Sequence, residues 1–181
     1  MDKAVGILEL ASVADGYLVA NEIKKNTMTR LWLTDPICPG CFLLIISGDV
    51  ASIRAAMEMA QALVQDEILS EGMLASIHPG VLEALVSPKG LPVGKALGIV
   101  ETLAIAPAIL ASDGAVKTAQ VELIELRIAG GMGGKALVLF AGEVDAVKAA
   151  LTKAQHLVEP AALASSVLVA SPHLELLSQW Q

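Results

Sequence analysis

The sequence predicts an α/β protein of the α+β kind, in which one ferredoxin-like unit occurs twice in tandem. The first observation behind this prediction is an internal repeat: Ala-Val-Gly-Ile-Leu-Glu at residues 4–9 returns as Ala-Leu-Gly-Ile-Val-Glu at residues 96–101. A second related pair of segments, residues 48–56 and 142–150, lies at nearly the same spacing. The second observation is the order of strand-like and helix-like patterns, which is strand, helix, strand, strand, helix, strand in each copy.

In the first copy, each expected element follows from its local pattern. Residues 5–10 form a short apolar run that suits a buried strand, and Ser12 or Asp15 offers an N-cap for the helix that follows. Leucines alternate with other residues at 30–34, which indicates a strand, and Asp49 precedes a second helix with apolar residues at helical spacing. The expected strands are residues 5–10, 30–34, 41–47 and 68–77, with a hairpin loop at 36–40.

The second copy repeats this plan after a turn-rich linker, Ser-Pro-Lys-Gly-Leu-Pro at residues 87–92. We therefore predict two domains, residues 1–91 and 92–181, each near the lower size limit for an independent core. The expected elements of the second copy are strands at 96–101, 121–128, 136–141 and 167–170, and helices around 108–117 and at 143–157.

The composition favours a protein that buries apolar surface between subunits. Hydrophobic residues make up 55% of the chain and aromatic residues only 3%, an excess of small apolar side chains that indicates an obligate oligomer. The longest uncharged stretches are shorter than the roughly 18 to 20 apolar residues that span a bilayer, so no transmembrane helix is predicted. The N-terminus shows no secretory signal, and we expect a cytoplasmic protein. A net charge of −7 with scattered Lys and Arg argues against nucleic-acid binding.

Several short motifs, all in duplicate, resemble the bacterial microcompartment shell-protein domain. They are Gly-Ile-Leu-Glu in the first strand, a helix that ends in lysine, a hairpin tip rich in glycine, and Gly-Asp-Val at the start of a helix. The resemblance covers essentially the whole chain. It implies a structural protein and not an enzyme: a homotrimer of tandem domains, called a pseudohexamer, with a central pore. Such plates tile with other shell proteins to form the microcompartment shell.

The resemblance also implies roles for particular residues. In this family the loop between the second and third strands of each copy lines the pore, and a lysine near the end of the first helix lies at the edge between neighbouring plates. The matching pore-lining residues are Pro39, Gly40, Gly131, Met132 and Gly133, and the matching edge lysines are Lys25 and Lys117.

Cys38 has the most distinctive chemistry in the chain. Pro36 and Pro39 restrict the backbone around it and Gly40 permits a tight turn, so the thiol is expected on a stiff tip. The loop resembles that of tandem-domain shell proteins from propanediol-utilisation microcompartments. This implies one [4Fe-4S] cluster per trimer, on the three-fold axis, with Cys38 at the matching ligand position and enclosed redox enzymes as partners. The alternative is a buried or loop cysteine that has no role as a ligand.

A second cysteine, Cys41, departs from the resemblance, which predicts a non-cysteine residue, typically lysine, at this position. A thiol oxidoreductase would place a Cys-x-x-Cys motif at a helix N-terminus, but here a strand is expected at 42–46. Zinc would need two further ligands, and His78, His156 and His173 do not have the spacing of a zinc-binding pair. Cys41 is kept as a second candidate metal ligand.

The glycine-rich loop at 130–135 does not match a nucleotide-binding loop. A phosphate-binding loop needs Gly where Ala129 stands and Ser or Thr where Ala136 stands, and a dinucleotide loop needs a helix directly after it. Glu9 and Glu101 recur at the same place in both copies, which favours a structural role over catalysis.

Four functions therefore remain open. The first is a shell protein whose pore holds an iron–sulfur cluster for electron or cluster transfer across the shell. The second is a shell pore for small metabolites without a cluster, and the third is a thiol oxidoreductase that uses Cys38 and Cys41. The fourth is a small regulatory or ligand-binding module.

Overall fold

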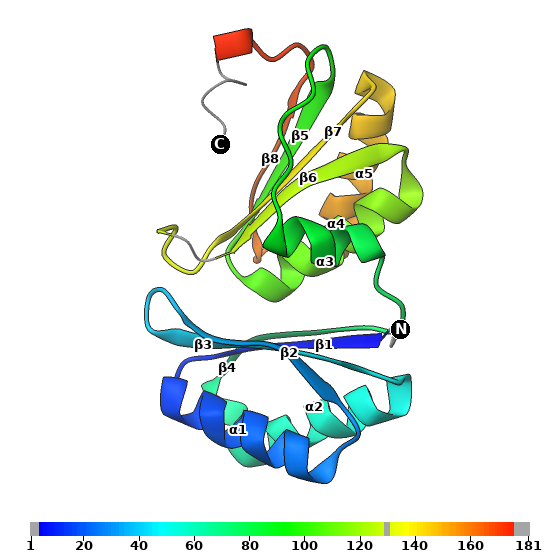
Figure 1. The fold of residues 1–181 in the computed structure, drawn as a ribbon. Helices are drawn as coiled ribbons and strands as arrows, with labels where there is room; N and C mark the ends of the chain where they lie inside the picture. Colours follow the sequence, from blue (N-terminus) through cyan, green and yellow to red (C-terminus); the bar gives the residue numbers. More distant parts are fainter. Residues whose placement is uncertain (1–3, 129–130, 176–181) are drawn as a thin grey trace. The chain divides into compact units, whose positions relative to one another are not determined.

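The computed structural model describes residues 4–128 and 131–175, and its chain divides into two compact units. The first unit runs to Ile77 and includes the short segment that ends at Gly134, and the second comprises His78–Ile128 and the residues from Lys135 onward. Each unit contains a four-stranded antiparallel sheet with two long helices packed against it (Figure 1). The predicted fold class, two tandem α+β units, is confirmed.

In the first unit the strands lie in the order β2-β3-β1-β4. Ser12 and Asp49 cap the two helices: the Ser12 hydroxyl accepts a hydrogen bond from the Asp15 backbone N–H, and the Asp49 carboxylate accepts one from that of Ser52. The elements are β1 Ala4–Leu10, α1 Val13–Asn26, β2 Arg30–Ile37, β3 Cys41–Gly48, α2 Val50–Val64, the 3-10 helix η1 Gln65–Glu67, and β4 Ile68–Leu74.

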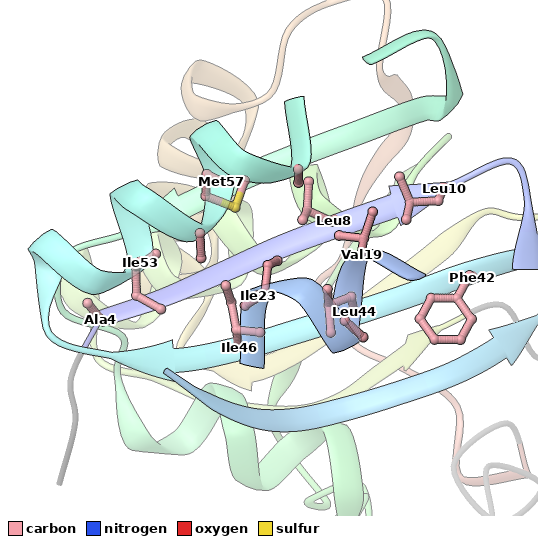
Figure 2. Packing of buried hydrophobic residues seen from close by; sticks show 13 residues of the cluster. Ala4, Leu8, Leu10, Val19, Ile23, Phe42, Leu44, Ile46, Ile53 and Met57 are labelled. Atoms are coloured by element: carbon pink, nitrogen blue, oxygen red, sulfur yellow. The ribbon is translucent and has the colours of Figure 1, made fainter. Parts of the chain in front are cut away.

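The core of this unit lies between the sheet and its two helices (Figure 2). Leu8 and Leu44 from the sheet meet Val19 of α1 and Ile53 of α2, and all four side chains are fully buried. Burial of apolar side chains at this sheet and helix periodicity is the main stabilising contribution to such a fold. The core therefore fixes β3, which is the second strand of the hairpin that carries the cysteines.

The second unit repeats the architecture, with strand order β6-β7-β5-β8, and adds a short helix at its start. That helix, α3, packs against β6 and α4, and the His78 side chain caps it by accepting a hydrogen bond from the Gly80 backbone N–H. The elements are α3 Pro79–Val86, β5 Ala96–Thr102, α4 Ile105–Thr118, β6 Val121–Ile128, β7 Ala136–Gly142, α5 Val144–Leu157, and β8 Leu163–Val169.

Several element ends differ from the sequence-based expectation. β2 runs past the expected end at residue 34 to Ile37, because its pairing with β3 continues to Ile37 opposite Cys41. The expected loop at 36–40 therefore shrinks to residues 38–40. β4 ends at Leu74 instead of residue 77, and β8 begins at Leu163 instead of residue 167. The domain boundary between residues 91 and 92 stays a prediction.

No helix in the described part of the chain combines the length and the apolar character that crossing a bilayer requires.

Candidate functional site

The hairpin between β2 and β3 presents Cys38 at its tip. The backbone N–H of Gly40 donates a 2.8 Å hydrogen bond to the carbonyl oxygen of Ile37, which closes the turn, and Gly40 has a φ of 102°. A side chain there would be strained, so glycine is required. The peptide bond between Cys38 and Pro39 is cis. Cys38, Pro39 and Gly40 are all exposed, and Cys38 is a free thiol.

Cys41 lies beside this tip but in a different environment. It is the first residue of β3, it is half-buried, and it is also a free thiol. As the sequence predicts, the motif is followed by a strand, so no helix N-terminus is present to favour the thiolate of a thioredoxin-like site. The two cysteines thus differ in accessibility: Cys38 faces solvent on a turn, and Cys41 belongs to the sheet.

The equivalent hairpin, between β6 and β7, has a tip made largely of glycine. Gly131, Gly133 and Gly134 have φ angles of 74°, 63° and 88°, a conformation that residues with a Cβ rarely adopt. Met132 is half-buried, and Gly131 and Gly133 are exposed. A strand follows this loop, as expected, which excludes a dinucleotide-binding arrangement. Ala129 and Gly130 lie outside the described residues.

The strand register explains what stands at position 41 in the second copy. Leu10 pairs with Phe42 in the first sheet, and Thr102 pairs with Ala136 in the second, so Cys41 is equivalent to Lys135. The Lys135 ammonium lies 2.9 Å from a carboxylate oxygen of Glu101. This ion pair has no counterpart at residue 41, because a cysteine stands there.

That ion pair also bears on the two glutamates that recur in the sequence. Glu101 is bound to Lys135, and Glu9 lies almost fully buried in β1. Neither environment resembles the pair of carboxylates flanking a substrate that hydrolytic chemistry needs. The surroundings of both glutamates therefore favour a structural role over catalysis.

The two edge lysines lie near the ends of equivalent helices. Lys25, in the last turn of α1, makes a 3.2 Å ion pair with Glu22. Lys117, in the last turn of α4, makes a 2.6 Å ion pair with Asp113, whose side chain is buried. Both ammonium groups lie on well-exposed side chains. Their role between plates stays a prediction.

Sequence reasoning missed Asp113. One oxygen of its carboxylate binds Lys117, and the other accepts a 2.7 Å hydrogen bond from the backbone N–H of His78, so it anchors α3 to α4. The signal in the sequence was a lone acidic residue within a helix made mostly of small and apolar residues.

Among the residues the structure describes, no group of three or more His, Cys, Asp or Glu side chains could hold a metal ion. A metal centre at Cys38 would need thiolates from more than one chain.

Comparison with known proteins identifies the family. The family model described as the BMC domain matches the chain twice, at residues 4–78 and 96–172. The bacterial microcompartment shell protein PduT of Citrobacter freundii is 38% identical over 154 residues, which cover 85% of this chain and 84% of that protein. The carboxysome shell protein CsoS1A of Hydrogenovibrio crunogenus is 38% identical over 85 residues, 46% of this chain and 86% of that protein.

Solved structures agree with these sequence matches. The crystal structure of a microcompartment protein from Desulfitobacterium hafniense superposes with a TM-score of 0.84 at 35% identity, covering 97% of this chain and 98% of that one. A fused, permuted hexameric shell protein from the RMM microcompartment shares the fold, with a TM-score of 0.67 at 23% identity, covering 86% of this chain and 81% of that one.

These relatives are named as shell proteins, which are structural and not enzymatic, as the sequence predicts. The chain belongs to the BMC domain family, as a tandem-domain shell protein of a bacterial microcompartment.

Proposed function

We propose that three copies of this shell protein form a pseudohexameric plate whose central pore carries one [4Fe-4S] cluster, held by Cys38 of each copy. When bound, the cluster would supply one-electron transfer across the shell, to or from redox enzymes enclosed by it. The observation that carries the proposal is the contrast between the two hairpin tips. One tip of each chain presents an exposed thiol on a short turn, and the described residues of the other tip include none.

The stoichiometry supports an assembly and not a single chain. Iron–sulfur clusters are held by several cysteine thiolates, but each chain offers one exposed cysteine. A three-fold axis through the pore would bring three equivalent thiolates to one point. One iron of the cluster would then carry a ligand that is not a cysteine.

The chemistry of the tip suits such a ligand. Cys38 is exposed and free of any disulfide, and Pro39 and the hydrogen bond between Gly40 and Ile37 hold the turn in one conformation. A ligand on a rigid turn loses little conformational freedom when it binds a metal. The tip of the second copy, rich in glycine, would leave room on the axis.

A second candidate is a pore that passes small metabolites without a cluster. The observation that favours it is the second tip, where the backbone of Gly131, Gly133 and Gly134 lies in positive-φ conformations and presents little side-chain bulk. Consecutive backbone N–H groups in such turns can bind anions. In either case the partners would be further copies of the chain and other shell proteins.

The test compares Cys38→Ser with Cys41→Ser, both purified without oxygen. Cys38→Ser should lose all iron and the visible absorbance of the cluster and keep the mass of the assembly, because an exposed turn residue contributes little to packing. Cys41→Ser is the matched control and should keep its iron. Iron that persists in Cys38→Ser, or that disappears only in Cys41→Ser, would overturn the assignment. An assembly without iron in the unchanged protein would favour the metabolite pore.

A further inference from the structure

The edge strand is exposed in the first unit and covered in the second. In β2, Leu31 and Trp32 are 40% and 36% exposed, whereas Leu123 and Ile124 of β6 are 4% and 0% exposed. Apolar side chains of this size usually lie in a core or an interface. The two copies share one fold, so the difference reflects what lies over the strand and not the strand itself.

The strand register shows that these residues are true equivalents. Leu31 pairs with Ile46, which in turn pairs with Gly6. Leu123 pairs with Phe140, which pairs with Gly98. Trp32 and Ile124 each occupy the irregular position directly after the leucine. The same surface of the domain is therefore apolar in both copies.

In the second unit, the helix α3 lies next to the edge strand β6. This helix packs against β6 and α4, and a groove beside it is lined by His78, Glu83 and Leu123. The hydrogen bond from the His78 backbone N–H to Asp113 fixes the start of α3 on α4. The helix α4 buries residues around much of its circumference, including Ile109 and Asp113.

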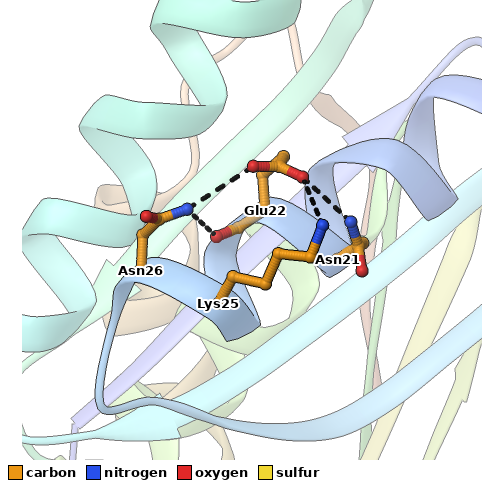
Figure 3. A network of polar contacts seen from close by, with 4 residues as sticks. All are labelled: Asn21, Glu22, Lys25 and Asn26. Carbon is orange, nitrogen blue, oxygen red and sulfur yellow. Dashed lines mark hydrogen bonds and ion pairs between the residues drawn. The ribbon is translucent and has the colours of Figure 1, made fainter.

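In the first unit, the matching helix α1 is open to solvent on that side. Tyr17 is the equivalent of Ile109 and is 56% exposed, and Asn21 is the equivalent of Asp113 and is also exposed. The amide nitrogen of Asn21 donates a 2.9 Å hydrogen bond to Glu22, within a network that includes Lys25 (Figure 3). The amide oxygen of Asn21 is of a kind that can accept a backbone hydrogen bond, as the Asp113 carboxylate does.

The helix α3 directly follows β4, the last strand of the first copy, and the second copy ends in a similar segment after β8. His78 lies four residues after the end of β4, and His173 lies four residues after the end of β8. Each imidazole Nδ1 accepts a hydrogen bond from the backbone N–H two residues on, at Gly80 and at Glu175. Leu174, which follows His173, is 61% exposed.

The sequence of this segment continues the match, although residues 176–181 lie outside the described part of the chain. Leu176, Leu177 and Trp180 stand at the positions of Val81, Leu82 and Leu85 in α3. In α3, Val81 is fully buried, and Leu82 and Leu85 are half-buried. The C-terminal segment therefore has the apolar pattern that covers an edge strand in the second unit.

We infer that the C-terminal segment from His173 onward docks on α1 and β2 of a second copy, as α3 covers α4 and β6 within the chain. The backbone N–H of His173 would donate to the side chain of Asn21, and Leu31 would be buried. Such a head-to-tail contact uses two different surfaces, so it generates a closed ring when the rotation allows. The inference rests on the proposed trimer and supplies the contact that closes it.

The experiment places a charge on the exposed face and measures mass. In Leu31→Glu, the glutamate is accommodated in the isolated chain, where the site is 40% exposed, but would be buried in the contact. Because the contact would bury a charged side chain in place of an apolar one, the dissociation constant of the assembly should rise at least about tenfold per contact. Native mass spectrometry over a dilution series measures this. Leu63→Glu on α2, which is 47% exposed, is the matched control and should keep the native mass.

A second variant that ends at Pro172 removes the docking segment and should weaken assembly similarly. The two changes act on one contact, so combining them should add little to either alone. The inference would be overturned if neither change altered the mass of the assembly, or if their effects on the dissociation constant were additive. It would also be overturned if the segment docked within its own chain and left the mass intact, or if Leu63→Glu weakened assembly as much as Leu31→Glu. If the unchanged protein itself is monomeric at every concentration, the proposed trimer fails instead.

Discussion

The two copies of the domain share their strand register residue by residue, yet they differ at the hairpin tip. In the first copy a three-residue turn carries an exposed thiol and in the second the described tip carries glycines at positive φ. The sheets that hold the tips pair identically, with Glu9 opposite Leu43 and Glu101 opposite Leu137. Duplication has therefore allowed one tip to change its chemistry while the scaffold stayed the same.

A tandem chain suits a three-fold site because it halves the number of copies of each tip residue around the axis. A ring of six identical domains would bring six copies of every tip residue to its axis, whereas three tandem chains bring three copies of each of two tips. Three thiolates match the ligand demand of one cluster better than six, and glycines in the other tip add little bulk. The described residues of the two tips differ in this way, with a thiol in one and glycines in the other, while the fold of the two copies is the same.

The two copies also differ in the space around an equivalent glycine in the first strand of each sheet. Substitution of this glycine is expected to have the largest effect on stability. A Cβ at Gly98 would overlap the ring of Phe140, which is fully buried. At the equivalent Gly6, a Cβ would lie 3.0 Å from Ile46 and from the flexible Met57. Gly98→Ala should therefore lower the free energy of unfolding by about 3 kcal/mol, and Gly6→Ala by about 1 kcal/mol.

Urea unfolding of both variants at one protein concentration measures the difference. Equal losses would mean that the two sheets tolerate extra volume alike, and that the contrast in packing has no energetic consequence.

The helices after β3 and β7 differ in their caps, and this predicts a smaller effect. Asp49 caps α2 through two hydrogen bonds from Ser52, at 2.8 Å each, whereas Glu143 makes no such bond at α5 and pairs with Lys95. The hydrogen bond from the Ser52 backbone N–H lowers the pKa of Asp49 below its ordinary value of 3.8. The ionised form is therefore favoured by folding.

The sign of the pH dependence follows from that direction. The contribution of Asp49 is complete above the unfolded pKa and is lost as the pH falls through the lower native pKa. Asp49→Ala should lower the melting temperature at neutral pH, and its difference from the unchanged protein should shrink at acid pH. Glu143→Ala is the control and should have a smaller effect. A difference for Asp49→Ala that grows toward acid pH would contradict this account.

Much of the fold could be predicted because the repeat shows each element twice. The ends of elements were less certain: β2 continues through Pro36, and an edge strand tolerates proline because one side of its backbone has no partner strand. The cysteine tip was predictable from its flanking Pro and Gly residues. The place of α3 was not, because an amphipathic pattern shows that a helix has a buried face but not what it is buried against.

The sequence pattern also could not predict which packed pairs of side chains change in size between the two copies. Phe42 packs against Gly16 so closely that a Cβ there would overlap its ring, while the equivalent pair in the second copy is Ala136 and Ala108. Which small residue faces which large one is decided by the register of distant strands and helices. Local propensity carries no information about it.

The proposed three-fold metal site depends on the divergence of the two tips, which would bring three thiolates to one axis. Its most direct test is the iron content of the unchanged protein, purified without oxygen and measured on the assembled fraction. With one cluster per trimer, about four iron atoms and four inorganic sulfides are expected for every three chains. Assembled protein of trimeric mass with iron at background level would contradict it.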